Sequence, residues 1–120
     1  MLVTGANTTT LGGTNTYHGL TTIDGGKLAT ASDGALSANS DLVMLNSGLL
    51  TVNNDGTVNS ILNGSVLVGS PATINLNGTG TSLTTSSGLW GQNGGTMTGN
   101  GTFIKTSAGT LTLDGANAVD

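Results

Sequence analysis

Cysteine, arginine and glutamate are absent from the sequence, and tyrosine, tryptophan and phenylalanine occur once each. Without cysteine the chain has no disulfide framework, no thiolate metal site and no cysteine nucleophile. A thick globular core depends on bulky side chains, because large apolar residues bury the most area per residue. The core residues on offer are mainly Val, Leu and Ile, which favours a thin core built from many short strands.

Charge is also scarce, since Lys, Arg, Asp and Glu together make up 7% of the chain and the net charge is −4. Lys27 and Lys105 are the only lysines. A nucleic-acid surface needs many Lys and Arg side chains on one face, so we expect no nucleic-acid partner. No apolar run approaches the roughly 18 residues of a membrane-spanning helix, so we expect no membrane insertion by this segment.

Glycine, threonine, asparagine and serine dominate the sequence, with 21 glycines among 120 residues. Such a composition is compatible with disorder, but the single proline, the low net charge and the recurrent Val, Leu and Ile favour an ordered chain. Helix propensity is low throughout, whereas short segments alternate apolar and small polar residues, as strands do. We expect strands at residues 8–11, 20–23, 27–30, 42–45, 49–52, 58–62, 66–68, 73–76, 82–85, 101–105 and 109–113.

Asp-Gly and Asn-Gly pairs separate these segments. Their first residues are at positions 24, 33, 55, 63, 77, 93, 100 and 114. Both pairs accept the positive φ that tight corners require. They also occur in two-residue hairpins, so an antiparallel meander is the first alternative to a parallel arrangement.

The two ends of the chain repeat one another, because Leu11, Gly13 and Asn15 match the Leu, Gly and Asn at positions 113, 115 and 117. Gly-x-Leu patterns between them recur at intervals of about 20 residues, a plausible length for one solenoid coil. We therefore predict that residues 1–120 form a single all-β β-solenoid segment of about five or six coils. Successive coils would pair in parallel, with aliphatic side chains inside and Asn ladders at the corners.

Residues 99–117 resemble the repeat that is associated with autotransporter passenger domains. They contain its Gly-x-Gly start, a lysine, a Gly-Thr-Leu-x-Leu core and a Gly-x-Asn end, and residues 13–28 are similar to its continuation. Leu20 departs from the repeat, which often has a second glycine there, and residues 41–95 match it only in style. The residues that carry the resemblance are Gly13, Asn15, Tyr17, Gly19, Ile23, Leu28, Gly101, Gly109, Leu111, Leu113, Gly115 and Asn117.

The resemblance implies a right-handed, single-stranded parallel β-helix that is exported through an outer-membrane barrel. The first residues lack the basic and apolar blocks of a signal peptide, so we expect the export signal and the barrel to lie outside this chain. The chain would then be a fragment or module of a longer passenger, with repeat-like ends at 10–28 and 99–119. We expect it at the bacterial cell surface or in the extracellular space.

Candidate catalytic residues have simpler structural explanations. His18 occupies the variable position of the corner Asn-Thr-Tyr-x-Gly, where we expect a solvated side chain. Asp33, Asp41 and Asp55 are the candidate carboxylate cluster, because enzymes that cleave carbohydrates use paired acids. Asp33 and Asp55 precede glycine, however, as turn residues do, and the chain has no basic cleft residues to match. We therefore expect no enzyme activity, no catalytic residue and no cofactor.

Three other patterns point to binding only weakly. The loop 53–56 is a poor calcium site, because Ca²⁺ takes about six to eight oxygen ligands with several carboxylates among them, so we expect no metal. Thr-x-Thr triplets would suggest ice binding in a regular array, but those at 8–10, 14–16, 79–81, 96–98 and 110–112 are unevenly spaced. Trp90 is expected to pack in the core or against a loop.

These observations together predict a structural and adhesive stalk that acts in adhesion or self-association. The expected partners are further copies of the chain, joined end to end or side by side, or a host or cell-surface ligand. One alternative is a self-assembling subunit of head-to-tail filaments, because a cut β-helix exposes a pairing edge at each end. A second alternative is a fragment of a β-helix carbohydrate-active enzyme.

Overall fold

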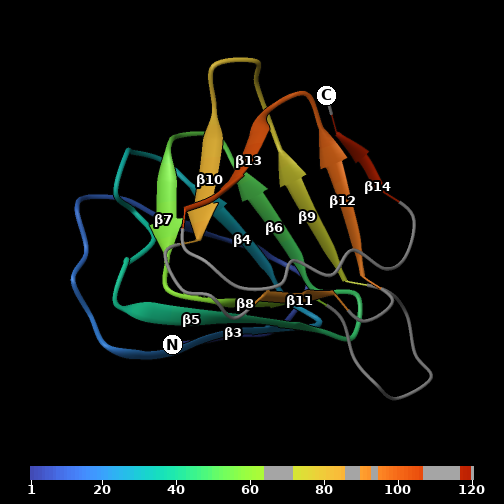
Figure 1. The fold of residues 1–120 in the computed structure, drawn as a ribbon. Coiled ribbons are helices and arrows are strands. Elements are labelled where there is room, and N and C mark those ends of the chain that lie inside the picture. The colour runs from blue at the N-terminus through green and yellow to red at the C-terminus, as the bar shows by residue number, and fades with distance from the viewer. Residues whose placement is uncertain (64–71, 86–89, 93–94, 107–116, 120) are drawn as a thin grey trace.

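The computed structural model describes residues 1–63, 72–85, 90–92, 95–106 and 117–119. Over these residues the chain is all-β and winds into a β-solenoid of about four turns, whose successive strands pair in parallel. Figure 1 shows the strands gathered into three sheets that form the walls of the solenoid. The predicted single-stranded parallel β-helix is therefore confirmed. Parallel pairing is the same for either sense of winding, so the right-handed sense stays a prediction.

The number of coils is lower than the five or six expected, because each turn uses more chain. Residues that bond across neighbouring turns are 23 positions apart at Thr30 and Asn53, and 24 apart at Asn53 and Asn77. The expectation rested on coils of about 20 residues. Between Thr30 and Asn53 the additional length lies in residues 31–39, which form no strand.

Each wall is a parallel sheet in which a strand pairs with strands of the turns before and after it. Sheet A has the order β1 (Leu2–Val3), β3 (Gly19–Asp24), β5 (Ser40–Leu45), β8 (Ile61–Asn63) and β11 (Trp90–Gln92). Sheet B has the order β2 (Thr8–Leu11), β4 (Lys27–Thr30), β6 (Leu49–Val52), β9 (Thr73–Leu76), β12 (Thr96–Gly99) and β14 (Asn117–Val119). Sheet C is shorter and consists of β7 (Gly56–Val58), β10 (Ser82–Thr85) and β13 (Thr102–Lys105).

The alternating pattern located most strands well. Strands β2, β4, β6, β9 and β10 have the predicted bounds, and β3, β5 and β13 differ from them by one or two residues. The prediction of one strand over 58–62 is wrong, because β7 ends at Val58 and β8 begins at Ile61 on a different wall. Strands β1, β11, β12 and β14 were not predicted, and the predicted strands 66–68 and 109–113 lie outside the described residues.

The antiparallel alternative is wrong for the described strands, all of whose pairs are parallel. Several of the Asp-Gly and Asn-Gly pairs form corners between walls instead of hairpins. Gly25, Gly34 and Gly78 have φ values of 66°, 72° and 117°, which glycine adopts without steric cost. The corner between β5 and β6 was not expected as a turn, and it places Asn46 and Ser47 at positive φ values of 47° and 61°.

The core is a narrow stack of aliphatic side chains, because every second residue of a strand points inward. In sheet B the inward column runs from Leu28 through Leu50 and Ile74 to Met97 in direct register. All four side chains are at most 2% exposed. Burying a side chain of this size stabilises the fold by about 1.5–3 kcal/mol, so repetition over successive turns compensates for the lack of aromatic residues.

Candidate functional site

Amide side chains form a ladder at the corner between sheets B and C. Asn53 donates from its backbone N–H to Thr30 Oγ1 at 2.9 Å and from Nδ2 to the Thr30 carbonyl at 3.0 Å. Asn77 Nδ2 donates to Asn53 Oδ1 at 2.7 Å, and Asn100 Oδ1 accepts from the backbone N–H of Gly78 at 2.9 Å. The predicted Asn ladder is therefore present at this corner as one amide–amide hydrogen bond, between Asn53 and Asn77, and the bonds to Thr30 and Gly78 continue the connection between turns.

Two other corners use aspartate as the acceptor. Asn46 Nδ2 donates to Asp24 Oδ1 at 2.7 Å, between neighbouring turns at the end of sheet A. Asn59 Nδ2 donates to Asp41 Oδ1 at 2.6 Å near the start of β5. Both carboxylates thus accept a hydrogen bond from an asparagine side chain of the following turn. This role is structural.

The motif residues in the first turns form a hydrogen-bonded corner. Asn15 Nδ2 donates to the carbonyls of Gly12 at 3.1 Å and Ala35 at 2.7 Å. Thr21 Oγ1 lies 2.9 Å from Ser40 Oγ and 3.1 Å from the Tyr17 hydroxyl. The first turns are therefore joined by the Asn15 bond to Ala35 and by the contact of Thr21 with Ser40, whereas the Tyr17 hydroxyl contacts Thr21 within its own turn.

The other motif residues are backbone or core positions. Gly13 and Gly19 have φ values of 75° and 93°, and Ile23 and Leu28 are buried in the core. Gly101 is packed so closely that an added Cβ would lie 2.8 Å from the Thr81 carbonyl oxygen. Asn117 begins β14. Gly109, Leu111, Leu113 and Gly115 lie outside the described residues, so the C-terminal copy of the motif stays a prediction.

A cavity of about 540 Å³, which we call the polar groove, lies beside sheet C and is formed by parts of the segments 14–16, 33–39, 55–57 and 82–84. The first two segments are irregular loops, and the other two lead into or belong to β7 and β10. Leu36 packs beneath this region against Gly56, where an added Cβ would lie 3.3 Å from its Cδ1. The groove therefore marks the place where the loop wall of the early turns meets sheet C.

Asp33 and Asp55 form a carboxylate rail along the polar groove. Asp33 Oδ1 accepts from the backbone N–H of Asp55 at 3.0 Å. Asp55 Oδ1 accepts from the backbone N–H of Ser82 at 2.8 Å and from its hydroxyl at 3.1 Å. Each carboxylate thereby satisfies a donor one turn further along. The second oxygen of each carboxylate accepts no hydrogen bond from the part of the chain that the structure describes.

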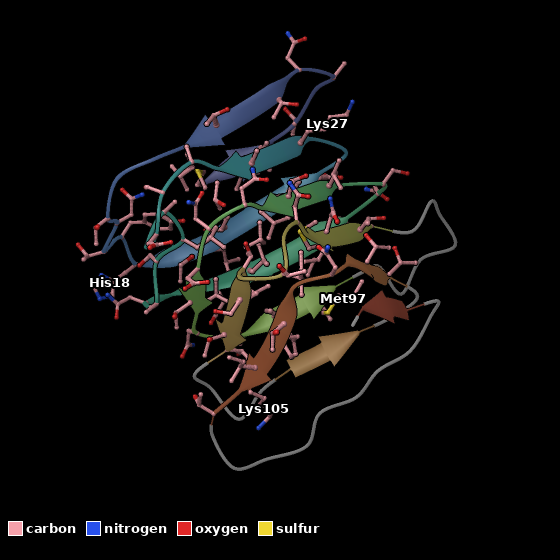
Figure 2. The ribbon with its side chains drawn as sticks, turned by 90° about the horizontal axis from the view of Figure 1, so that it is seen from above. His18, Lys27, Met97 and Lys105 are labelled. Carbon is pink, nitrogen blue, oxygen red and sulfur yellow. The ribbon has the colours of Figure 1, made fainter. Side chains whose placement is uncertain are left out.

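The structure divides the candidate carboxylate cluster. Asp33 and Asp55 share the groove, whereas Asp41 lies on β5 and bonds to Asn59. Among the described residues, no group of at least three His, Cys, Asp or Glu side chains is placed to hold a metal ion. Figure 2 shows His18 at the outer edge of the molecule, and its side chain is exposed. The solvated position expected for His18 is confirmed.

One surface pattern was missed by the sequence analysis. On the outer face of sheet A, Leu2, Val43 and Leu62 occupy one column in register, with Thr22 between them. Leu2 and Leu62 are 67% and 43% exposed, and the nearby Leu20 is 54% exposed. We call Leu2, Leu20, Val43 and Leu62 the apolar face of sheet A. The alternating pattern at 20–23 and 42–45 could have revealed this face, because it places Leu20 and Val43 on the side of each strand that points away from the core.

The Thr-x-Thr triplets, considered above for ice binding, lie partly on one wall of the solenoid. Those at 8–10 and 96–98 face outward from the same sheet B. Between them, Lys27 and Leu49 occupy the column that begins at Thr8. Figure 2 shows Lys27 on this wall. The charged and aliphatic side chains interrupt the hydroxyl array.

Comparison with known proteins identified no relative of this chain. No family model matches the sequence, and no match was found among curated proteins or among solved structures. Among the described residues, no helix has the length and hydrophobicity that a membrane crossing requires. What the chain does must therefore be argued from the solenoid, its ladders, the polar groove and the apolar face of sheet A.

Proposed function

We propose that the chain is a structural and adhesive β-helix stalk of a bacterial surface-exposed autotransporter passenger, acting in adhesion or self-association. The observation that carries this proposal is the continuous stacking of parallel turns, whose corners are joined by side-chain ladders. Each added turn lengthens such a rod by about 4.8 Å. A stack of this kind suits a spacer that holds a binding surface away from a cell.

The corner formed by Asn15 and Tyr17 supports the link to passenger repeats. These residues carry the sequence resemblance. The Asn15 side chain donates to the Ala35 carbonyl one turn further along, and the backbone carbonyl of Tyr17 accepts from Ser37 Oγ. A repeat that keeps this asparagine keeps its side-chain joint between turns. The proposed surface location and export follow from the resemblance alone.

The apolar face of sheet A supports side-by-side self-association. Exposed apolar patches on a soluble protein often mark an interaction surface. Leu2, Leu20 and Leu62 are each more than 40% exposed, while Thr22 interrupts their column and Asp41 pairs with Leu20 in register. Two copies that pack through this face would remove these side chains from water. Burial of this kind is the main favourable contribution to most protein association.

Head-to-tail assembly is the second candidate. Within the described residues, β1 pairs only with β3 and β2 pairs only with β4, so each offers a second strand edge. Open edges accept further strands, from adjoining sequence or from another copy. The carbohydrate-active enzyme has weaker support, because Asp41 bonds to Asn59 away from the groove that holds Asp33 and Asp55.

The test is sedimentation of the purified chain over a range of concentrations. We expect reversible association that weakens in the double variant Leu20→Asp/Leu62→Asp, which places charge on the apolar face. The control Thr51→Asp adds one charge to the outer face of sheet B, as the single variant Leu62→Asp does to the apolar face, and should associate like the parent. A parent chain that stays strictly monomeric at high concentration would contradict self-association. Association that all variants retain equally would point to the strand edges.

A further inference from the structure

Side chains of the polar groove are used differently from those of the corners. At the corners, Asn53, Asn59 and Asn77 use their amides to join neighbouring turns. In the groove, Thr57 and Thr84 stand side by side on adjacent strands and are partly exposed. Their hydroxyls bond to no residue in the part of the chain that the structure describes. Each hydroxyl is a donor and an acceptor, so the groove offers both to a ligand.

The charge of the polar groove restricts the class of ligand. Asp33 and Asp55 are the charged residues in its lining, and neither lysine belongs to it. An anionic ligand would be repelled by the two carboxylates. A bound divalent cation is not supported either, because no third acidic, histidine or cysteine ligand is placed nearby among the described residues. The two carboxylates therefore favour a ligand that is rich in hydrogen-bond donors and carries no negative charge.

The shape of the polar groove favours a short extended ligand. Segments of four successive turns contribute to it, and turns stacked at about 4.8 Å give a length of about 14 Å. Its volume of about 540 Å³ lies within the range of roughly 300–1,000 Å³ that is common for ligand sites. Within the described part of the chain no aromatic residue lines the groove, so a ligand cannot stack on an aromatic face there and its affinity is expected to be weak.

We propose that the polar groove binds a short neutral oligosaccharide. The hydroxyls of Thr57 and Thr84 and the open oxygens of Asp33 and Asp55 provide the hydrogen bonds. Sugar hydroxyls donate and accept at the same time, which matches this mixed set, and a carboxylate oxygen makes the stronger bonds. The inference names the ligand class for the adhesive part of the proposed function and rests on that function for its biological setting.

Nuclear magnetic resonance titration of the full chain tests the inference. The probes are the trimer of N-acetylglucosamine and maltotriose, with a sialylated trisaccharide as the anionic comparison. We expect backbone amide shifts within the groove segments for at least one neutral probe and none for the anionic probe. The double variant Thr57→Val/Thr84→Val keeps the shape of both side chains and should weaken binding about tenfold, because it removes two hydrogen bonds. The control Thr51→Val makes the same change on sheet B and should bind like the parent.

A second variant distinguishes loss of binding from loss of folding. Asp55→Asn keeps an Oδ1 acceptor for Ser82 but changes the open oxygen to an amide, so we expect weaker binding with an unchanged circular dichroism spectrum. The inference is overturned by absence of shifts with every neutral probe, by shifts outside the groove, or by preference for the anionic probe. Sedimentation of the same samples reports self-association separately. If the chain associates but binds no sugar, the inference about the groove is refuted and self-association stands. If the chain binds sugar but does not associate, self-association is refuted and the inference about the groove stands.

Discussion

The Asp55 carboxylate accepts hydrogen bonds from both the backbone N–H and the hydroxyl of Ser82, a residue 27 positions later in the chain and one turn further along the solenoid. Asp55 is itself bound through its backbone N–H by Asp33. The Asp-Gly pairs at these positions therefore do more than form turns. Their side chains align the segments that lead into sheet C.

Removing this acceptor should weaken the joint between two turns. Asp55→Ala leaves the N–H and hydroxyl of Ser82 to water, and we expect a loss of about 1 kcal/mol in the free energy of unfolding. Asp55→Asn retains the acceptor and should lose less. Urea denaturation followed by circular dichroism measures both, and equal losses in the two variants would argue against a role for the hydrogen bonds.

Leu49 and Leu50 provide a direct test of which face of sheet B is buried. Leu50 is 0% exposed, whereas Leu49 faces outward and is partly exposed. We expect Leu50→Ala to lower the free energy of unfolding by about 2–5 kcal/mol through the lost contacts and the remaining cavity. Leu49→Ala should cost clearly less. Denaturant unfolding would contradict the register if the two losses were the same or reversed.

Gly101 and Gly80 should respond in opposite ways to an added methyl group. A Cβ on Gly101 would lie 2.8 Å from the Thr81 carbonyl oxygen and 2.9 Å from Leu76 Cβ, so the backbone must shift. We expect Gly101→Ala to destabilise the fold by about 1–3 kcal/mol, as overpacking does. Gly80 has no atom within 4 Å of the added position, and Gly80→Ala should be neutral or stabilising because it restricts the unfolded chain. Thermal denaturation compares the two, and a tolerated Gly101→Ala would be the unexpected result.

Variants of Thr21 and of its neighbour Thr22 compare the hydrogen-bonded corner around Tyr17 with the ordinary outer surface of the strand. Thr21 is 1% exposed and lies beside Ser40 and the Tyr17 hydroxyl. Thr21→Val removes the central hydroxyl, and we expect a loss of about 1 kcal/mol. Thr22→Val changes the outward face and should cost little. A double-mutant cycle with Tyr17→Phe, measured by urea unfolding, should give a coupling energy of about 0.5–1 kcal/mol, and strict additivity would show that the corner is not a unit.

Local pattern determined most of the strands, because the alternation of apolar and small polar residues repeats with the period of a β-strand. It placed β2, β4 and β6 at their observed bounds. The scarcity of aromatics and charge correctly indicated a thin, aliphatic core. The repetition of Gly, Leu and Asn indicated coils and so distinguished a parallel solenoid from a meander.

The tertiary structure alone decided which residues of different turns meet. Side-chain hydrogen bonds between turns join residues as few as 18 positions apart at Asp41 and Asn59 and as many as 28 apart at Asn53 and Thr81, so no fixed repeat length locates them. The corner after Val58, the carboxylate rail, the polar groove and the apolar face of sheet A all depend on that register. A strand's own sequence sets which side chains point outward, but only the path of the chain around each corner sets their neighbours.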